Sequence, residues 1–243
     1  MFVTIKFDYC YAGHMPRQMP VSRRERPAKL ALTRDRIVDA AMAILASDGA
    51  QGVTMRKVAA ALDTGPASLY VYVRNATELS SLLIDRLIAS LDLSWDGVEP
   101  WRGRMHRVLA DYSTMLASHS GIARSAVFVW PDGPHYLDLI ELLMRLLTAA
   151  GVEPETAARA TDLLLQHSTA AAAEWEGRRE GGEQELSDLV STLESADPQR
   201  HPTLKALGTA IFVRGSNEDR SAWLIDMMLD GILAPRTAGQ LDG

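Results

Sequence analysis

The sequence predicts an all-α protein with a small N-terminal domain and a larger C-terminal domain. Almost everywhere after residue 32, apolar residues recur three and four positions apart, which is the spacing of one face of an α-helix. Glycine and proline divide the chain into runs of helical length. A chain of 243 residues with 47% hydrophobic residues is long enough for one large or two small folded domains.

The first residues do not match a targeting segment. Lys6 and Asp8 interrupt the apolar stretch at the start, so it fails as a signal peptide, and no charge-free run approaches the length of a transmembrane helix. Cys10 is the only cysteine, which excludes an internal disulfide framework or a multi-cysteine zinc site. We therefore expect a cytoplasmic protein that does not contact a membrane.

Charge is distributed unevenly along the chain. The net charge is −6, but residues 1–80 hold 11 Lys and Arg against 7 Asp and Glu, a net charge of +4, whereas residues 81–243 carry −10. We interpret residues 1–32 as a basic arm that is able to neutralise DNA phosphates, or alternatively as a solvated, disordered leader. Its basic residues, with the start of the next segment, are Arg17, Arg23, Arg24, Arg26, Lys29, Arg34 and Arg36.

Four short helices are predicted next. Thr33 is a good N-cap for a first amphipathic helix that ends at Gly49, and Thr54 caps a second one. A turn at residues 63–65 stops the second helix, and Pro66 then begins a third helix of about seven residues. A fourth helix is expected from Thr77 to about residue 93, with leucines along one side.

The second and third helices have the pattern of a helix-turn-helix motif, because a three-residue turn containing glycine joins two short helices. Leu69 is placed to anchor the third helix to the core. Small and hydroxyl side chains at the start of such a helix read base edges, while tyrosine and arginine reach phosphates. The side chains expected to face outward are Pro66, Ala67, Ser68, Tyr70, Val71, Tyr72 and Arg74. Periodicity alone leaves open an ordinary helical hairpin whose tyrosines are buried.

Residues 32–87 resemble the DNA-binding domain of the tetracycline-repressor (TetR) family. The stretch reads LTRDRIVDAAMAILASDGAQGVTMRKVAAALDTGPASLYVYVRNATELSSLLIDRL and contains a whole three-helix head in the family's order. The resemblance implies a homodimeric, all-helical, ligand-responsive transcription regulator, usually a repressor. It also implies that Arg56 contacts guanine, that Thr54 contacts a phosphate, and that residues 66–68, Tyr70 and Tyr72 contact bases and groove walls.

Two positions depart from the family pattern. Ala76 stands where the family commonly has a phosphate-binding lysine, so Arg74 or the basic arm would have to supply that charge. Residues 91–93 lack the histidine with which the tetracycline repressor holds its drug. A tetracycline–magnesium complex is therefore not the ligand that this sequence predicts.

The rest of the chain resembles that family in architecture only. Helices are expected at 100–118, 121–130, 134–150, 154–177, 185–195, 202–213 and 217–234. The segment GRREGGEQE, residues 177–185, is predicted to be a flexible connecting loop, since it is rich in glycine and lacks the ending of a phosphate-binding loop.

Two apolar stripes suggest a dimer interface. One stripe holds Leu224, Met227, Met228, Gly231 and Ile232, and the other holds Ala157, Leu164, Ala171 and Trp175. Two such helices from each subunit would form a four-helix bundle, although both stripes could instead pack inside one subunit.

Aromatic and methionine side chains with a few polar groups predict a cavity for a small, largely apolar molecule. The predicted lining is Tyr112, Met115, His119, Phe128, Trp130, Tyr136, Met144, His167 and Trp175.

Enzyme and metal-binding functions have no support in the motifs. The six histidines form no HExxH or Glu-x-x-His pair, and no Gly-x-Ser-x-Gly elbow or Rossmann glycine fingerprint occurs. We expect a regulator without a cofactor, with residues 33–79 binding a palindromic DNA operator and residues 80–243 binding ligand and a second copy. The alternatives are a helical enzyme with scattered catalytic groups and a helical interaction protein without affinity for DNA.

Overall fold

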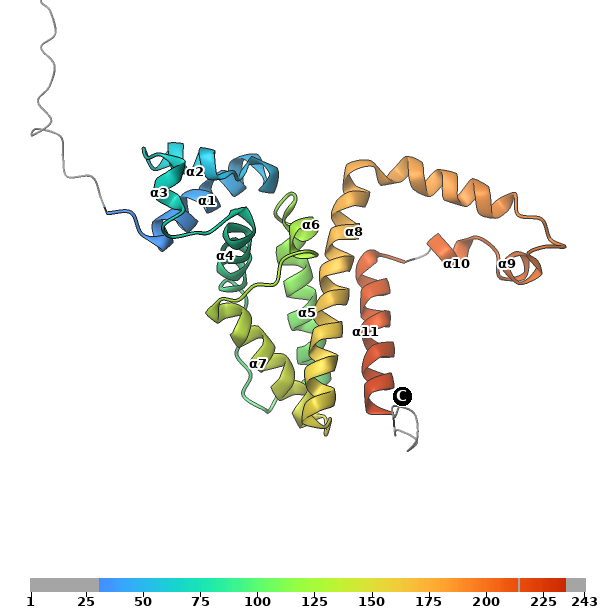
Figure 1. Ribbon diagram of the computed structural model, residues 1–243. Helices are drawn as coiled ribbons and strands as arrows, with labels where there is room; N and C mark the ends of the chain where they lie inside the picture. Colours follow the sequence, from blue (N-terminus) through green and yellow to red (C-terminus); the bar gives the residue numbers. More distant parts are fainter. Residues whose placement is uncertain (1–30, 214, 235–243) are drawn as a thin grey trace, which may run out of the picture. The chain divides into compact units, whose positions relative to one another are not determined.

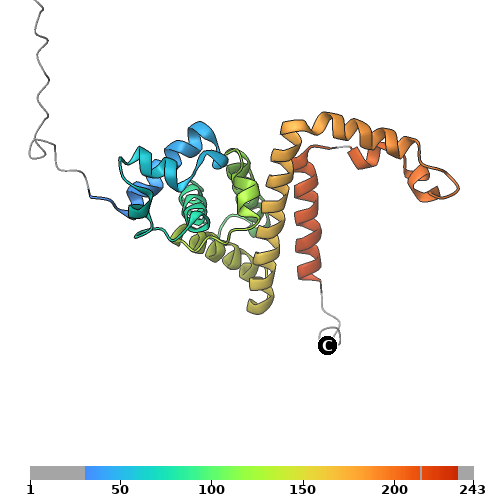
Figure 2. The ribbon, with the colours of Figure 1, turned by 45° about the horizontal axis from the view of Figure 1, so that its top comes forward.

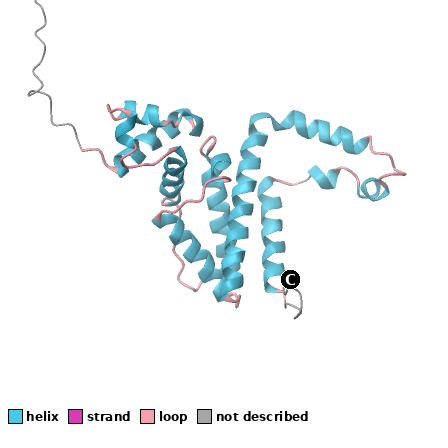
Figure 3. Ribbon diagram, viewed as in Figure 1, coloured by secondary structure: helices cyan, strands magenta, loops and turns pink. Residues whose placement is uncertain are grey.

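The computed structural model describes residues 31–213 and 215–234, and within them the secondary structure is helical, without a strand (Figures 1 and 3). The all-α prediction is confirmed. The basic arm lies almost wholly outside the described residues, so its role stays a prediction. None of the helices in the described ranges combines the length and apolarity that a membrane crossing requires.

Three α-helices and a short 3-10 turn form the N-terminal head: α1 (Arg34–Asp48), η2 (Ala50–Gly52), α2 (Met55–Ala61) and α3 (Pro66–Leu69). The hydroxyl groups of Thr33 and Thr54 accept hydrogen bonds from the backbone N–H groups of Arg36 and Lys57, so both predicted caps are confirmed. Ile37, Ala41 and Val58 are fully buried between the helices, and Leu69 joins them.

The third helix is shorter than predicted. α3 ends at Leu69, and Tyr70, Val71 and Tyr72 form a hydrogen-bonded turn in place of a second helical turn. The N–H groups of Tyr72 and Val73 both donate to the carbonyl of Leu69, and Val73 is completely buried. The turn therefore directs Leu69 and Val73 inward and leaves the residues between them at the surface.

Helix α4 (Ala76–Ile88) connects the head to the body and also differs from the prediction at both ends. Asn75 caps its start, two residues before the expected Thr77. It ends at Ile88, and the expected extension to residue 93 is wrong. The buried guanidinium of Arg104 explains this, because it binds the carbonyl oxygens of Asp92 and Ser94 and holds that segment outside a helix.

The body is built from α5 (Trp101–Ala117), α6 (Ile122–Ala126), α7 (Pro134–Ala149) and α8 (Pro154–Glu194), with α11 (Asn217–Leu233) beside α8 (Figures 1 and 2). One apolar core joins these helices to the second half of α4. α6 is shorter than the expected 121–130: Val127 and Phe128 after it are exposed, and Pro131 disfavours a helical conformation of the residue before it.

Helix α8 runs through the segment that was predicted to be a loop. Residues 177–185 are helical, so the predicted connector is wrong. Glycine lowers helix stability by about 1 kcal/mol per residue relative to alanine but still adopts helical dihedral angles. Pairs of side chains four residues apart support the helix on both sides, Glu174 with Arg178 and Gln184 with Asp188. In Figures 1 and 2 α8 bends, and its orange part extends over the start of α11; glycines are common at such bends.

The C-terminal third ends in α9 (Pro202–Leu207), α10 (Ala210–Val213) and α11. The expected single helix over 202–213 is interrupted because Gly208 has a φ of 75°, a conformation that ends helices. Ser216 and Asp219 form a capping box at the start of α11. Arg102 of α5 then holds α11 through Asp226, at 2.8 Å, and Asp230, at 2.5 Å.

The two stripes proposed for a dimer interface have different surroundings. Ala157 and Leu164 are completely buried inside the subunit, so these two predicted interface residues are wrong and belong to the core. On α11, Met227 remains 51% exposed and Gly231 is exposed as well. Trp223 and Leu163, which the prediction did not include, add large exposed apolar side chains on α11 and α8.

Candidate nucleic-acid interface and effector cavities

The outward side of α3 and its following turn forms a continuous exposed surface. Tyr70 is 53% exposed, Val71 79% and Tyr72 40%. Leu69, which precedes them, is fully buried. The other residues predicted to contact DNA here, Pro66, Ala67, Ser68 and Arg74, are exposed too. We call these seven exposed residues the recognition surface. Small side chains lie at the helix start, where a recognition helix contacts base edges in the major groove, and aromatic rings lie beyond it.

Arg56 and Lys57 are neighbours on α2 with different environments. The ammonium group of Lys57 lies 2.7 Å from the carboxylate of Asp48, which lowers the pKa of Asp48. Arg56 is exposed and makes no ion pair within the described part of the chain. Its guanidinium group is therefore free to form a bidentate contact with guanine. The exposed hydroxyl of Thr54 accepts the cap hydrogen bond and still has its own proton to donate to a phosphate.

Arg74 is only partly available to compensate for the alanine at position 76. Its Nε lies 3.0 Å from Glu78 Oε2, and its backbone N–H donates to the same oxygen at 2.6 Å. That backbone hydrogen bond is the main cause that lowers the pKa of Glu78, with Arg74 and Arg34 contributing charge. The side chain of Arg74 is still 78% exposed, so the rest of its guanidinium group faces solvent.

Three of the predicted ligand-binding residues meet in one cavity of about 310 Å³ between α5, the α6–α7 connection, α7 and α8. Tyr112 forms one wall, and its hydroxyl lies 3.2 Å from Thr169 Oγ1. Burial raises the pKa of Tyr112 to about 12, and burial followed by the charge of Asp162 raises the pKa of Tyr136. Both phenols are protonated at neutral pH and present hydrogen-bond donors beside aromatic walls. We call this space the aromatic cavity; Trp130 is its third predicted member.

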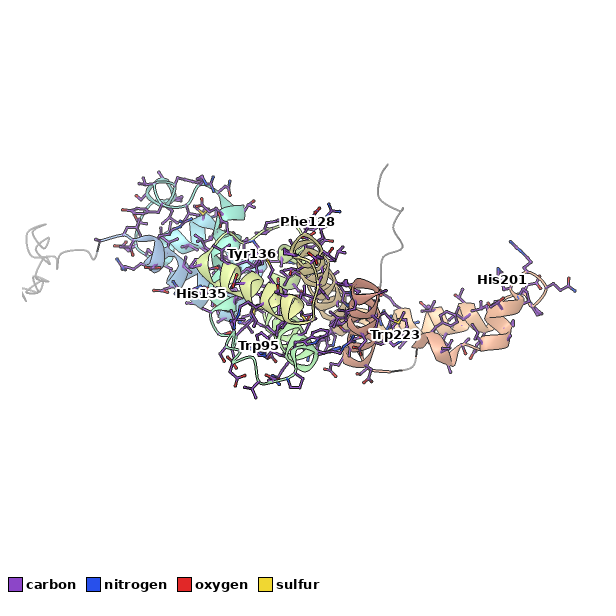
Figure 4. The ribbon with its side chains drawn as sticks, turned by 90° about the horizontal axis from the view of Figure 1, so that it is seen from below. Trp95, Phe128, His135, Tyr136, His201 and Trp223 are labelled. Carbon is purple, nitrogen blue, oxygen red and sulfur yellow. The ribbon has the colours of Figure 1, made fainter. Side chains whose placement is uncertain are left out.

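His167 and Trp175 line a different cavity, of about 670 Å³, between α8, α10 and α11. Burial lowers the pKa of His167, so the imidazole is neutral at pH 7. Its Nε2 lies 3.5 Å from Ser221 Oγ. The nine predicted ligand-binding residues therefore do not form one site. In Figure 4, Trp223 of this second cavity lies on α11, well apart from Tyr136.

Four of the predicted residues line neither cavity. Met115 is buried in the core, and His119 is held by a 3.0 Å hydrogen bond between its Nδ1 and the carbonyl of Met115. Phe128 is 84% exposed and points to solvent (Figure 4), and Met144 is half-buried on α7. The connection after α6 turns Phe128 outward while its neighbours Val127 and Val129 line the aromatic cavity.

Several lining residues of the aromatic cavity were not predicted. One stripe of α8 supplies Asp162, Leu165, Gln166, Thr169 and Ala170. These positions follow helical spacing, so the stripe was visible in the sequence beside the buried stripe of Ala157 and Leu164. Its mixed polarity concealed it, because a search for aromatic and methionine residues passes over such a surface.

Comparison with family models gives two matches that together cover most of the chain. Residues 37–79 match the model of bacterial regulatory proteins of the tetR family, and residues 96–236 match the model of the tetracyclin repressor-like C-terminal domain.

Individual relatives agree with these models. The chain is 33% identical over 135 residues to the transcriptional repressor DrrR1 of Streptomyces coeruleorubidus, an alignment that covers 55% of this chain and 50% of that protein. The chain thus spans about half the length of the curated relatives it matches. It is 26% identical over 113 residues, 44% of this chain and 58% of the relative, to the nicotine-responsive repressor HdnoR of Paenarthrobacter nicotinovorans.

Solved structures extend the likeness to nearly the whole fold. The Streptomyces protein SCO7704, assigned as a transcription regulator, is 40% identical with a TM-score of 0.72, over 87% of this chain and 99% of that one. The TetR-family protein ActR of Streptomyces coelicolor, in complex with actinorhodin, is 30% identical with a TM-score of 0.75, over 84% of this chain and 97% of that one.

Proposed function

Because the chain belongs to the TetR family of helix-turn-helix transcriptional regulators, we propose that it is a dimeric cytoplasmic repressor that leaves its operator when a small molecule fills the aromatic cavity. This family regulates transcription by binding DNA and does not catalyse reactions, so the enzyme alternative is set aside. One observation carries the proposal: the recognition surface is exposed around a buried anchor, Leu69, in a chain that also contains the aromatic cavity, which is open to solvent.

The DNA-binding role rests on the recognition surface together with Arg56. Tyr70, Val71 and Tyr72 are large side chains that an unbound helical hairpin would bury, yet they face solvent. Arg56 supplies a cation without a competing acid on the neighbouring helix. We assign base reading to Arg56 and to residues 66–68, and phosphate or sugar contacts to Thr54, Tyr70, Tyr72 and Arg74.

Dimerisation is proposed through α8 and α11. Trp223 and Met227 of α11 and Leu163 of α8 expose large apolar surface, which a second copy of the chain would cover. A twofold dimer presents two recognition surfaces and therefore reads a palindromic operator. The interface that we propose thus differs from the predicted one, because it excludes Ala157 and Leu164 and adds Leu163 and Trp223.

The effector is proposed to be a planar, largely apolar molecule with a few hydrogen-bonding groups. Trp130, Tyr112 and Tyr136 supply aromatic walls, and Gln166 and Thr169 supply polar groups at one side. The complex of ActR with actinorhodin supports a small-molecule effector for this chain, because that relative is 30% identical to it; the chemical class is proposed from the cavity lining alone.

Selection of DNA from a pool of random duplexes tests the proposed function. The full chain should enrich one sequence with twofold symmetry, whose half-site centres lie about 34–36 Å apart, and two chains should bind each duplex. Enrichment of no sequence over the starting pool, at low salt as well as at physiological salt, would contradict the DNA-binding role.

A further inference from the structure

The most informative structural detail outside the recognition surface is the start of α7. A helix N-terminus has backbone N–H groups without partners inside the helix, and the residue that precedes the helix usually caps them with its own side chain. In α7 that residue is Gly133, which has no side chain to offer. The cap is supplied from another helix.

Asp85 of α4 is this cap. Its side chain is buried, its Oδ1 accepts a hydrogen bond of 2.9 Å from the backbone N–H of Tyr136, and its Oδ2 lies 2.9 Å from Nδ1 of His135. A carboxylate at a helix N-terminus is favourable, because the N–H groups there carry partial positive charge. Asp85 therefore ties the middle of α4 to the first turn of α7.

The contact of Asp85 with the start of α7 also explains why residue 133 is a glycine. Its φ of −86° and ψ of 171° are dihedral angles that alanine adopts easily, so the backbone does not require glycine here. A Cβ atom at this position would overlap the carboxyl group of Asp85. The absence of a side chain at residue 133 is what lets the carboxylate enter.

A further hydrogen bond lies one turn earlier on α4. Ser81 Oγ donates to Asp132 Oδ1 at 2.9 Å, so two side chains four residues apart on α4 both bind the end of the α6–α7 connection. We call Ser81, Asp85, Asp132, Gly133 and the N-terminal turn of α7 the α4 clamp.

The α4 clamp adjoins the aromatic cavity. Tyr136 takes part in both, since its backbone N–H binds Asp85 while its side chain lines the cavity. Trp130 and Pro131, which line the cavity as well, immediately precede Asp132. Figure 4 shows Tyr136 and His135 close together at the start of α7. A ligand that displaces the 130–136 segment must therefore move or break the clamp.

The other side of α4 is fastened to the head. Arg86, adjacent to Asp85, lies 2.6 Å from Asp39 and 3.2 Å from Asp35, both on α1. Leu79 and Leu83 of α4 are buried, and α4 packs on α1. Two neighbouring residues thus connect α4 to different parts of the molecule, Asp85 to the cavity wall and Arg86 to the head.

We propose that the α4 clamp is the link through which the filled aromatic cavity shifts α4 and thereby the recognition surface. The inference rests on the proposed function, because it supplies the physical connection for the release of DNA. A ligand changes the equilibrium only if it favours one arrangement of α4 over the other, and the clamp gives the ligand that difference.

The test uses the substitution Ala170→Trp to fill the cavity, since Ala170 lines it from α8 and no effector has to be known. Binding of the selected duplex is measured with and without this substitution in five backgrounds: the natural chain, Gly133→Ala, Asp85→Ala, the double variant of these two, and Asp138→Asn. Asp138 lies exposed on the next turn of α7, outside the clamp, and serves as the matched control.

We expect Ala170→Trp to weaken DNA binding by about tenfold or more in the natural chain and in Asp138→Asn, a coupling of at least about 1.4 kcal/mol. In the clamp variants it should weaken binding by less than about threefold, because the cavity no longer moves α4. Gly133→Ala should lower the unfolding midpoint in the natural chain but not when Asp85 is already alanine, since the overlapping group is then gone. His135→Ala removes one contact of Asp85 and should give an intermediate loss of coupling.

The possible failures are distinguishable. If Ala170→Trp weakens binding equally in all backgrounds, the clamp does not transmit the signal, although cavity control stands. If Ala170→Trp has no effect in the natural chain while the dimer and its DNA binding persist, the aromatic cavity does not control DNA binding. The proposed function and the role of the α4 clamp are then both wrong. If a clamp variant does not fold, His135→Ala decides the outcome: a full response to Ala170→Trp in that variant contradicts the proposal.

Discussion

At the scale of single residues, DNA recognition depends on which cations are already neutralised inside the protein. Lys57 is bound to Asp48, and Arg74 shares Glu78 with Arg34. Arg56 has no such partner in the part of the chain that the structure describes. A charge that is free in the unbound protein breaks no intramolecular ion pair on binding, which is why we propose Arg56 for base-specific contact.

The substitution Arg56→Ala should weaken binding to the selected duplex by about 1–3 kcal/mol and relax base preference at one pair of symmetric positions. Titrations with a set of duplexes, each changed at one position, measure both effects. Lys57→Ala is the matched control, and it should reduce binding less and equally for all sequences. An unchanged base preference in Arg56→Ala would show that another side chain reads that position.

At the scale of helices, the positions at which α4 and α8 end were hardest to predict. α4 stops at Ile88 because a buried arginine sixteen residues later takes the carbonyl groups that follow, and no local signal reveals that contact. The glycine-rich part of α8 stays helical although its composition favours a loop. The apolar spacing did identify α1, α2, α5, α7 and α11 within one or two residues, because each has a buried apolar stripe of its own and the sequence marks where each begins: a capping Thr or Ser precedes α1, α2 and α11, and a proline stands at the start of α5 and α7.

The predicted ligand-binding residues show the same limit of prediction from sequence. The sequence indicated aromatic and histidine residues that could bind a ligand, but two sides of α8 face two separate cavities. Residues 167 and 169 are close in sequence and line different spaces. Which side of a long helix each residue faces depends on the neighbouring helices, and composition does not contain that information.

Docking of α11 on α5 is expected to depend on pH through Asp226. Hydrogen bonds from His106 and then from Arg102 lower the pKa of Asp226 below its ordinary value. A carboxyl group with a lowered pKa in the folded protein stabilises the fold above the unfolded pKa of about 3.9, and this contribution disappears as the pH falls through the folded pKa.

The substitution Asp226→Asn should therefore lower the free energy of unfolding at pH 7, by at most about 1 kcal/mol because the group is partly exposed to solvent. The difference from the natural chain should shrink below about pH 4. Thermal unfolding followed by circular dichroism at several pH values measures this. A constant difference from pH 7 to pH 3 would mean that the hydrogen-bonded charge is not its cause.

At the scale of the whole molecule, the distribution of charge agrees with the proposed roles of the two parts of the chain. The first 80 residues carry a net charge of +4, and the remainder, with the cavities and the proposed dimer surface, carries −10. An acidic C-terminal part is repelled by DNA, so we expect DNA contact through the N-terminal part.

Removal of residues 1–28 tests the contribution of the basic arm, which lies outside the described residues. If the arm contacts phosphates, the shortened chain should bind every duplex more weakly, and the slope of log K against log salt should become shallower by about 0.9 for each phosphate that the arm had neutralised. Preference for the selected sequence should persist. Equal salt slopes for the full and shortened chains would indicate that the arm does not touch DNA.

The central claim is that this chain represses transcription and that filling its aromatic cavity ends the repression. The most direct measurement is the rate of transcription in vitro from a promoter that contains the selected duplex. The natural chain should lower that rate about tenfold, and the chain with Ala170→Trp should leave it close to the rate without protein while remaining a dimer. If the natural chain occupies the duplex but transcription continues unchanged, or if the filled cavity represses as strongly as the empty one, the claim is wrong.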